Sequence, residues 1–257
     1  MTIDQREWGR TRIVGGRHAF RQSLMLRELR GLASPPAEVL DAGCGDGALT
    51  AALLGRGFRV SAVDASGLCV ERCRQAVGCV PGGLEAGKRV LQSTLTALPF
   101  GDAGFDVVVS GEVLEHVEDD AAAVREMFRV LRPGGVCVLT VPADPRLWAI
   151  GDEWAKHLRR YGEDQLRGLF TAAGFGVVSL RRWGWPLTYL YDRYVFNLWL
   201  KRRIAAGRAN DEAAGGAGLA ARALTVALSV DRLFIGAPWG IGLVGVFQKR
   251  TEAGGPG

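Results

Sequence analysis

Val39-Leu40-Asp41-Ala42-Gly43-Cys44-Gly45-Asp46-Gly47 is the stretch of sequence that decides the fold of this chain. It joins a short apolar run, typical of a buried strand, to the helix-forming run 48–54 through three glycines spaced by one residue. Glycine has no Cβ and tolerates positive φ, so such a turn brings backbone close to a ligand. It also directs the N-terminus of the following helix at that ligand. The stretch therefore predicts a strand–turn–helix unit that binds a small molecule.

A carboxylate follows at the end of the next apolar run. Val60-Ser61-Ala62-Val63-Asp64 is expected to be the second strand, and it ends about twenty residues after the glycine turn. An acid in this place can accept hydrogen bonds from both hydroxyls of a ribose. The alternative is that Asp64 caps a helix beginning at Ser66. Taken with the glycine turn, Asp64 favours a nucleoside-binding site.

Strand-like and helix-like segments alternate along the rest of the chain, which predicts an α/β fold with a doubly wound, mostly parallel, seven-stranded sheet. Strands are expected near 37–41, 58–63, 88–92, 105–110, 135–141, 175–180 and 242–248. Helices are expected near 17–32, 47–56, 66–76, 119–131, 163–173 and 219–234. The expected organisation is an N-terminal helical cap (1–36), a core (37–182), a helical aromatic-rich insertion (183–241), the last strand (242–250) and a disordered tail (251–257).

The amino-acid composition limits the kinds of binding partner, the location and the metal content that can be expected. The 257 residues carry a formal net charge of only +5, and the sequence contains no dense run of Lys and Arg. No nucleic-acid partner is therefore expected. The first residues contain no apolar signal core, so a cytoplasmic location is expected. The five cysteines lack CxxC spacing and neighbouring histidines, so no metal is expected. The sequence leaves the oligomeric state open.

The glycine spacing separates two kinds of nucleotide site. Dinucleotide-binding turns read G-x-G-x-x-G, whereas this turn reads G-x-G-x-G and follows Asp41, whose charge would repel a pyrophosphate but suits a ligand with an amino group. In this respect the chain resembles the class I methyltransferases that depend on S-adenosylmethionine (SAM), with their E/D-x-G-x-G-x-G motif. The resemblance implies SAM as cofactor. It implies cofactor contacts from Asp41, Gly43, Cys44, Gly45, Asp64, Ala65, Thr94, Leu95, Gly111 and Glu112.

Two later blocks extend the resemblance. Thr94 to Phe100 is similar to the family's D-A-x-x-L-P-F segment, with Thr94 in place of the aspartate that contacts the adenine amino group. A hydroxyl accepts a weaker hydrogen bond than a carboxylate. Gly111 to Val117 is similar to the E-x-L-E-H block that lies against the methionine part of SAM. There, His116 is either a general base or a residue that packs under the cofactor loop.

The acceptor side is expected around Trp154-Ala155-Lys156-His157-Leu158-Arg159-Arg160-Tyr161, which resembles the H-x-R-R-Y segment of bacterial methyltransferases of small molecules. The resemblance implies His157 as the base, with Arg159, Arg160 or Tyr161 orienting the acceptor. The alternative is a structural network in which the arginines pair with Asp152, Glu153 or Glu163.

The insertion that begins at Trp183 is rich in aromatic residues and flanked by basic ones. It is expected to line a pocket for a bulky acceptor, with Trp183 and Tyr189 as contacts, to rest on a membrane surface, to form a dimer interface, or to be an ordinary helical subdomain.

The function expected from the resemblance is methyl transfer from SAM to a hydroxyl oxygen of a bulky natural product or a lipid- or quinone-like molecule. The alternatives are N- or C-methylation, a SAM-binding module without catalysis, and an NAD-dependent oxidoreductase. The glycine spacing and Asp41 disfavour the last of these.

Overall fold

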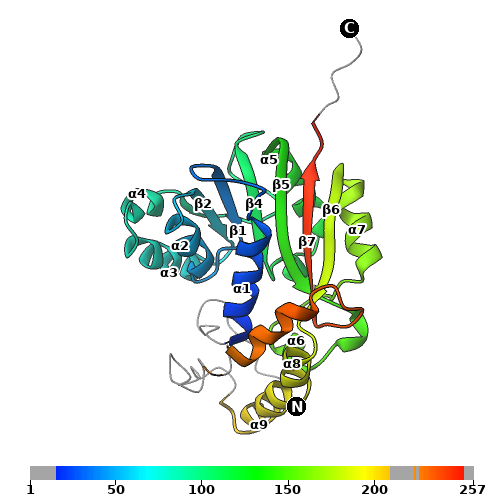
Figure 1. Ribbon diagram of the computed structural model, residues 1–257. Helices are drawn as coiled ribbons and strands as arrows, with labels where there is room; N and C mark the ends of the chain where they lie inside the picture. The colour runs from blue at the N-terminus through cyan, green and yellow to red at the C-terminus, as the bar shows by residue number, and fades with distance from the viewer. Residues whose placement is uncertain (1–15, 209–222, 224–225, 252–257) are drawn as a thin grey trace.

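The sheet of this protein has seven strands in the order β3-β2-β1-β4-β5-β7-β6, with only β7 antiparallel to its neighbours (Figure 1). The computed structural model describes residues 16–208, 223 and 226–251. The strands are β1 (Glu38–Ala42), β2 (Arg59–Asp64), β3 (Val90–Gln92), β4 (Phe105–Gly111), β5 (Leu131–Pro142), β6 (Phe175–Trp183) and β7 (Gly242–Lys249). The expected doubly wound, mostly parallel sheet is thereby confirmed.

The order of the strands reverses beside β1. Leu40 of β1 pairs with Ser61 of β2 on one side and with Val108 of β4 on the other, all in parallel. In an open α/β sheet the ligand crevice lies outside the carboxyl ends of the strands at such a point. The glycine turn leaves β1 at this end, so the fold places it where a ligand binds.

Helices cover both faces of the sheet. One face packs against α5 (Asp120–Val130) and α7 (Glu163–Ala172), which bury Met127 and Phe170. The other packs against α1 (Gly16–Glu28) and α2 (Ala48–Leu54), which bury Met25 and Leu53. The remaining helices beside the sheet are α3 (Gly67–Gly78), which begins after an Asp64–Ser66 turn, and the short α4 (Gly83–Gly87), which the sequence pattern did not predict.

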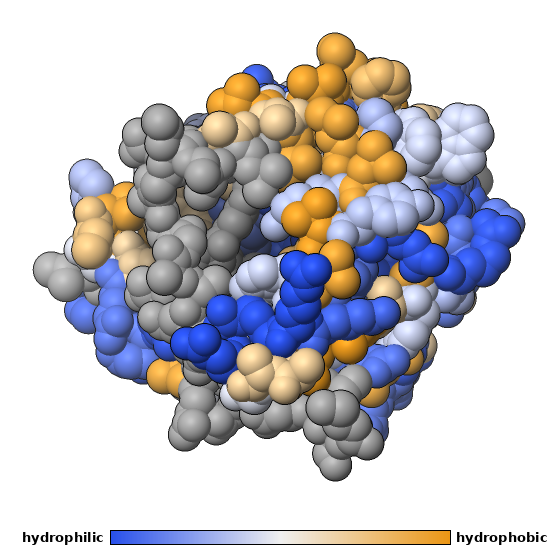
Figure 2. Space-filling view, turned by 90° about the horizontal axis from the view of Figure 1, so that it is seen from below, coloured by the Kyte–Doolittle hydropathy of each residue, from blue (hydrophilic) through white to orange (hydrophobic). Residues whose placement is uncertain are grey.

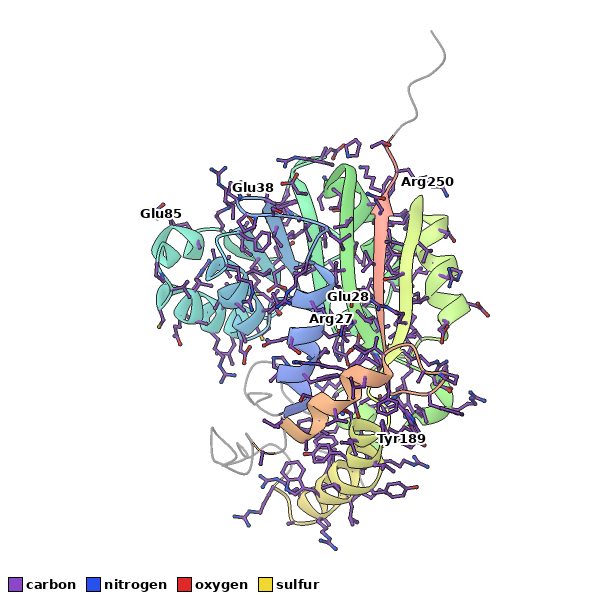
Figure 3. The ribbon with its side chains drawn as sticks, viewed as in Figure 1. Arg27, Glu28, Glu38, Glu85, Tyr189 and Arg250 are labelled. Carbon is purple, nitrogen blue, oxygen red and sulfur yellow. The ribbon has the colours of Figure 1, made fainter. Side chains whose placement is uncertain are left out.

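The aromatic insertion lies beyond the carboxyl ends of the parallel strands, at the lower end of the molecule in Figure 1. It contains α8 (Leu187–Leu190), the π-helical η3 (Tyr191–Phe196), α9 (Asn197–Ala205) and the 3-10 helix η4 (Ser229–Phe234). Buried Asp231 fastens it, because its carboxylate accepts hydrogen bonds from the backbone N–H groups of Leu187 at 2.9 Å and Thr188 at 2.7 Å. In Figure 3, Tyr189 of the insertion lies at this carboxyl edge and Glu38 at the opposite edge.

Several expectations fall wholly or partly outside the described residues. These are the N-terminal part of the helical cap (1–15), most of the first half of the helix expected at 219–234, and all but the first residue of the expected disordered tail. Over 229–234 the described chain forms a 3-10 helix rather than an α-helix. In the part of the chain that the structure describes, no helix combines the length and the apolar character needed to cross a bilayer.

Candidate cofactor and acceptor site

The three glycines of the turn have different surroundings. All three have positive φ: +91° at Gly43, +54° at Gly45 and +81° at Gly47. A Cβ at Gly43 would lie 2.3 Å from a methyl group of Val113, and a Cβ at Gly47 would lie 2.7 Å from the Cα of Cys73. A Cβ at Gly45 would meet no atom within 4 Å. Packing therefore requires glycine at 43 and 47, while the backbone at 45 faces open space that a ligand can fill.

Asp64 is attached to the same turn. Its Oδ2 accepts a hydrogen bond from the backbone N–H of Gly45 at 3.0 Å, and its Oδ1 accepts one from the N–H of Ser66 at 2.9 Å. Burial raises the pKa of this carboxyl, against the effect of those hydrogen bonds. Each carboxylate oxygen keeps a further lone pair. Asp64 thus shapes the turn and the start of α3, and it can still accept hydrogen bonds from ribose hydroxyls.

Asp41 lies in the interior of the protein. It is only 1% exposed, and its carboxylate accepts a hydrogen bond of 2.6 Å from the hydroxyl of Thr50 on α2. Burial raises its pKa to about 7. The buried side chain offers almost no surface to a ligand, and the cofactor contact of Asp41 stays a prediction. The carboxyl joins β1 to α2.

Of the other residues predicted to contact the cofactor, some are exposed and some are buried in the core. Ala65 and Thr94 are exposed, and the Thr94 hydroxyl is 3.1 Å from that of Thr96. Cys44 and Leu95 are buried, each in an apolar cluster, so only their backbone can face a ligand. A Cβ at Gly111 would lie 3.1 Å from the sulfur of Met25, so a side chain here would require Met25 to move by a few tenths of an ångström.

Glu112 combines backbone strain with a buried oxygen. Its φ of +57° is uncommon for a residue with a side chain, and strain of this kind concentrates at functional sites. Its carboxylate lies 3.6 Å from the guanidinium of Arg21. Its Oε1 is buried and receives no hydrogen bond from the described residues. An amino group of a ligand fits this oxygen, and the amino acid part of SAM carries one.

The two candidate bases, which the sequence places 41 residues apart, meet in space. The rings of His116 and His157 lie 4.8 Å apart between centroids. His157 Nδ1 is 2.8 Å from the carboxylate of Asp152, and His116 Nδ1 is 3.3 Å from the carbonyl oxygen of Lys156. Sequence reasoning assigned no role to Glu115, which lies 3.8 Å from His157 Nε2 and 3.9 Å from His116 Nε2. The feature of the sequence that points to Glu115 is its place between Leu114 and His116 in the E-x-L-E-H block.

The Arg-Arg-Tyr part of the acceptor block is largely structural. Arg159 pairs with Asp120 at 2.7 Å and Arg160 with buried Asp152 at 2.8 Å. Tyr161 is 0% exposed, and its hydroxyl donates to Asp120 at 2.9 Å. Its side chain therefore serves the packing of this loop, and its acceptor contact stays a prediction. The alternative of a network holding the loop is observed for both arginines, although Asp120 was not among the expected partners.

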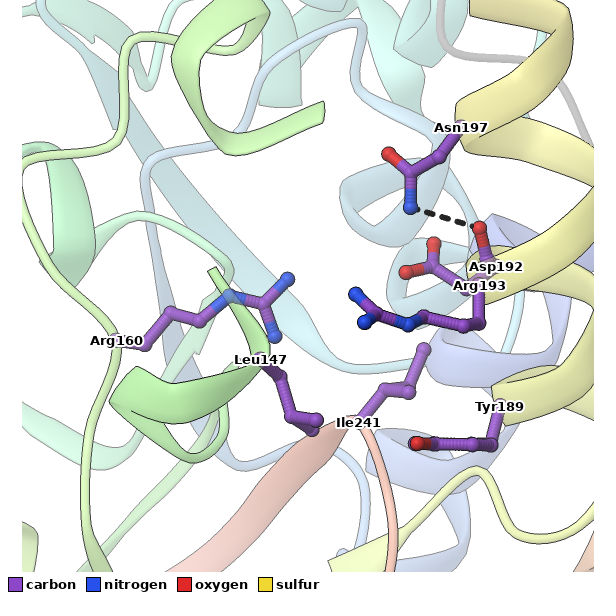
Figure 4. A pocket seen from close by; sticks show the side chains of 7 residues that line it. All are labelled: Leu147, Arg160, Tyr189, Asp192, Arg193, Asn197 and Ile241. Atoms are coloured by element: carbon purple, nitrogen blue, oxygen red, sulfur yellow. Dashed lines mark hydrogen bonds between the residues drawn. The ribbon is translucent and has the colours of Figure 1, made fainter. Parts of the chain in front are cut away.

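Trp183 and Tyr189, the two aromatic residues predicted to touch the acceptor, lie in different surroundings. Trp183 is 2% exposed and its ring centroid lies 5.9 Å from that of Phe20, so it is a core residue here and its acceptor contact stays a prediction. Tyr189 instead lines a narrow pocket (Figure 4). Figure 4 shows the guanidinium groups of Arg160 and Arg193 entering this pocket from opposite sides. The complete lining is Leu147, Arg160, Tyr189, Asp192, Arg193, Asn197 and Ile241.

Comparisons with known proteins agree with this geometry. Residues 40–139 match a family model described as a methyltransferase domain. The chain is 39% identical over 155 residues to the ubiquinone biosynthesis O-methyltransferase of Psychrobacter arcticus, covering 56% of this chain and 57% of that protein. It is 33% identical over 124 residues to the malonyl-[acyl-carrier protein] O-methyltransferase of Serratia marcescens, covering 48% of this chain and 46% of that protein. The matched region thus spans about half the length of these relatives.

Solved structures show the same fold at low identity. Geranyl diphosphate C-methyltransferase from Streptomyces coelicolor A3(2) aligns with a TM-score of 0.60 at 15% identity, covering 90% of this chain and 79% of that chain. The cyclase SpnF aligns with a TM-score of 0.60 at 22% identity, covering 90% and 81%. Since a cyclase shares the fold, the fold alone does not define the reaction. Sequence match, sheet order and glycine turn together show that this chain carries a class I SAM-dependent methyltransferase domain.

Proposed function

We propose that this chain transfers the methyl group of SAM to a hydroxyl oxygen of a small molecule. The observation that carries the proposal is the open backbone at Gly45 beside the Asp64 carboxylate, at the point where the strand order reverses. SAM supplies a methyl group on a sulfonium, which is reactive enough that alignment of the acceptor provides much of the catalysis. Asp64 and Glu112 would hold its ribose and its amino group.

His157 is suited to take the proton of the acceptor. The Asp152 carboxylate only accepts hydrogen bonds, so at 2.8 Å it keeps the proton of the neutral ring on Nδ1. The lone pair then lies on Nε2, where a general base needs it. His116 lies beside this ring and is the second candidate base.

The acceptor class follows from the insertion and from the relatives. Tyr189, Leu147 and Ile241 give the narrow pocket an apolar wall, and Arg160 and Arg193 bring positive charge to it. Asp192 adds a carboxylate to the same lining, so the pocket offers apolar contacts and charged groups of both signs to a polar group of an acceptor. The matched relatives are named as O-methyltransferases. On the names of these relatives we propose a natural product or a quinone-like phenol as the acceptor class.

The experiment that tests the proposal is transfer of an isotope-labelled methyl group from SAM to a panel of phenols, carboxylates and amines, with the products identified by mass spectrometry. Label on a phenolic oxygen supports the proposal. Label only on nitrogen or carbon would replace it with the corresponding N- or C-methyltransferase. Binding of S-adenosylhomocysteine without transfer to any acceptor class would favour a non-catalytic SAM-binding module.

The insertion also carries a surface suited to a membrane. Among its described residues, the exposed large apolar ones are Leu190, Tyr194, Val195, Leu198, Trp199, Val226, Val230, Leu233, Phe234 and Trp239. The exposed basic residues Arg193, Lys201 and Arg202 lie on the same helical segment. Seen from below, this end of the molecule shows apolar side chains gathered beside a strip of hydrophilic ones (Figure 2). We propose that this end contacts an anionic lipid surface, as such aromatic and basic faces do.

A further inference from the structure

Three side chains of metal-binding type converge at the acceptor side of the site. Glu115 and His116 belong to the 3-10 helix η1 (Leu114–His116), and His157 belongs to the loop after α6 (Ile150–Trp154). One ligand atom from each residue lies within 4.8 Å of the other two. Glu115 Oε1 is 3.8 Å from His157 Nε2 and 3.9 Å from His116 Nε2.

The far side of each imidazole is anchored in the way that metal-bound histidines usually are. The Asp152 carboxylate faces Nδ1 of His157 at 2.8 Å, and the carbonyl oxygen of Lys156 faces Nδ1 of His116 at 3.3 Å. Both partners accept hydrogen bonds and cannot donate them, so each Nδ1 carries a proton. In the neutral rings the lone pairs then lie on the two Nε2 atoms, on the side of Glu115. Ligating histidines commonly donate their other N–H to a carboxylate or a backbone carbonyl in this manner.

The burial of Glu115 supports a cation site independently of the histidines. Its side chain is 0% exposed, and neither carboxylate oxygen receives a hydrogen bond from the described residues. The separations of 3.8 and 3.9 Å to the imidazoles are too long for hydrogen bonds. Arg21 is the nearby cation, and its guanidinium faces Glu112 at 3.6 Å. A cation bound between this carboxylate and the two imidazole nitrogens turned toward it would compensate the burial of its charge.

We propose that Glu115, His116 and His157 bind a divalent transition-metal ion, best represented by Zn²⁺. Ligand atoms at about 2.1 Å from a tetrahedral ion are about 3.4 Å apart. The two Glu115–imidazole separations would therefore shorten by about half an ångström, and a pair at the 4.8 Å limit by about 1.4 Å. Two imidazoles and one carboxylate favour zinc, cobalt or manganese over magnesium and calcium, which prefer oxygen ligands. Three protein ligands leave a position for water or for an acceptor oxygen. The proposal differs from the expectation of no metal, which rested on the spacing of the cysteines and the absence of histidines near them in the sequence.

A bound ion would change how the acceptor loses its proton, a consequence that rests on the proposed function. The ion would occupy the Nε2 lone pair of His157, so His157 would be a ligand and not the base. The acceptor hydroxyl would bind at the open position, where the ion lowers its pKa and the proton leaves to water. The oxygen lone pair would then form the new O–C bond while the electrons of the C–S bond go to sulfur.

The test is a titration of the chelator-stripped full chain with Zn²⁺ by calorimetry, and with Co²⁺ by visible absorption. The wild type should bind close to one equivalent and give the absorption of a nitrogen- and oxygen-ligated, low-coordinate Co²⁺. E115Q and H157Q should each bind Zn²⁺ more than about 100-fold more weakly, because each loses a ligand. D152N keeps all three ligands but weakens the anchor of His157, together with the ion pair to Arg160, and should weaken binding about 10- to 100-fold.

The third histidine of the chain provides the matched control. His18 contacts Arg21 and Gln22, so H18N should bind Zn²⁺ like the wild type. Equal Zn²⁺ affinity in wild type, E115Q and H157Q, or a loss only in H18N, would overturn the proposal. Binding of S-adenosylhomocysteine by the same samples shows that the variants are folded and reports on the SAM site separately from the metal site. An absence of Zn²⁺ binding with normal S-adenosylhomocysteine binding therefore overturns the metal site alone.

Discussion

The carboxylate of Asp64 accepts a hydrogen bond from the backbone N–H of Gly45 at 3.0 Å, which joins the end of β2 to the turn after β1. The D64N substitution keeps the size of the side chain but removes its charge and half of its acceptor capacity. We expect affinity for S-adenosylhomocysteine to fall about 10-fold or more, because hydrogen bonds to a charged group contribute about 1.5–3 kcal/mol. Calorimetric titration measures this. E71Q, on the exposed face of α3, is the control and should bind normally.

Alanine substitution should affect stability at Gly47 and ligand binding at Gly45. G47A should destabilise the protein, because its Cβ would lie 2.7 Å from the Cα of Cys73. G45A has space for its methyl group and should cost about 1–2 kcal/mol for its left-handed conformation alone. That methyl group would occupy the space assigned to the cofactor, so G45A should lose ligand affinity while its fold persists. Urea unfolding and ligand titration of both variants separate the effects, and a G45A that binds S-adenosylhomocysteine like the wild type would contradict the assignment.

Asp41 makes the stability of the protein depend on pH. Burial raises its pKa in the folded state to about 7, above its value in the unfolded chain, so the folded state binds the proton more tightly. The stabilisation is complete below the unfolded pKa and is lost as pH rises through about 7, by about 4 kcal/mol as an order of magnitude.

D41N retains an oxygen that can accept the hydrogen bond of Thr50 but cannot ionise. The difference in unfolding free energy between D41N and wild type should therefore grow in favour of D41N between pH 5 and pH 8. Urea unfolding at the two pH values measures it. A difference that is independent of pH would show that Asp41 does not titrate in this range.

His157 should affect turnover more than cofactor binding. H157N should lower kcat by about 100-fold or more with little change in S-adenosylhomocysteine affinity, because it removes either the general base or a ligand of the proposed metal ion. H18N serves again as the control for cofactor affinity. Unchanged kcat in H157N would remove His157 from the reaction, whereas an equal loss of kcat and of cofactor affinity would indicate a structural role.

The basic residues of α9 should govern binding to anionic lipid. K201E/R202E should weaken binding to phosphatidylglycerol-containing vesicles by at least about 10-fold, since each basic residue near a membrane contributes about 1 kcal/mol. The matched control is R30E/R56E, which reverses two exposed charges in loops at the amino ends of β1 and β2. Co-sedimentation measures binding, and an equal loss in both variants would mean that the attraction depends on net charge and not on this surface.

The fold was predictable from sequence because each strand of the parallel sheet is a short apolar run with its own turn signal. Gly43 and Gly47 could be identified because a steric requirement selects glycine in both places. The site was predictable only in part. Motif position does not show which way a side chain points, so Asp41, Tyr161 and Trp183 were assigned to ligand contacts although all three are buried. Glu115 and His157 lie close together because of the path that the chain takes after β5, and local sequence patterns do not encode this path.

The central claim, that the crevice at Gly45 and Asp64 binds SAM, is tested most directly by titrating the wild-type chain with S-adenosylhomocysteine and, in parallel, with NAD. We predict saturable binding of S-adenosylhomocysteine, weakened in D64N, and no binding of NAD in the same concentration range. Binding of NAD with none of S-adenosylhomocysteine would contradict the account.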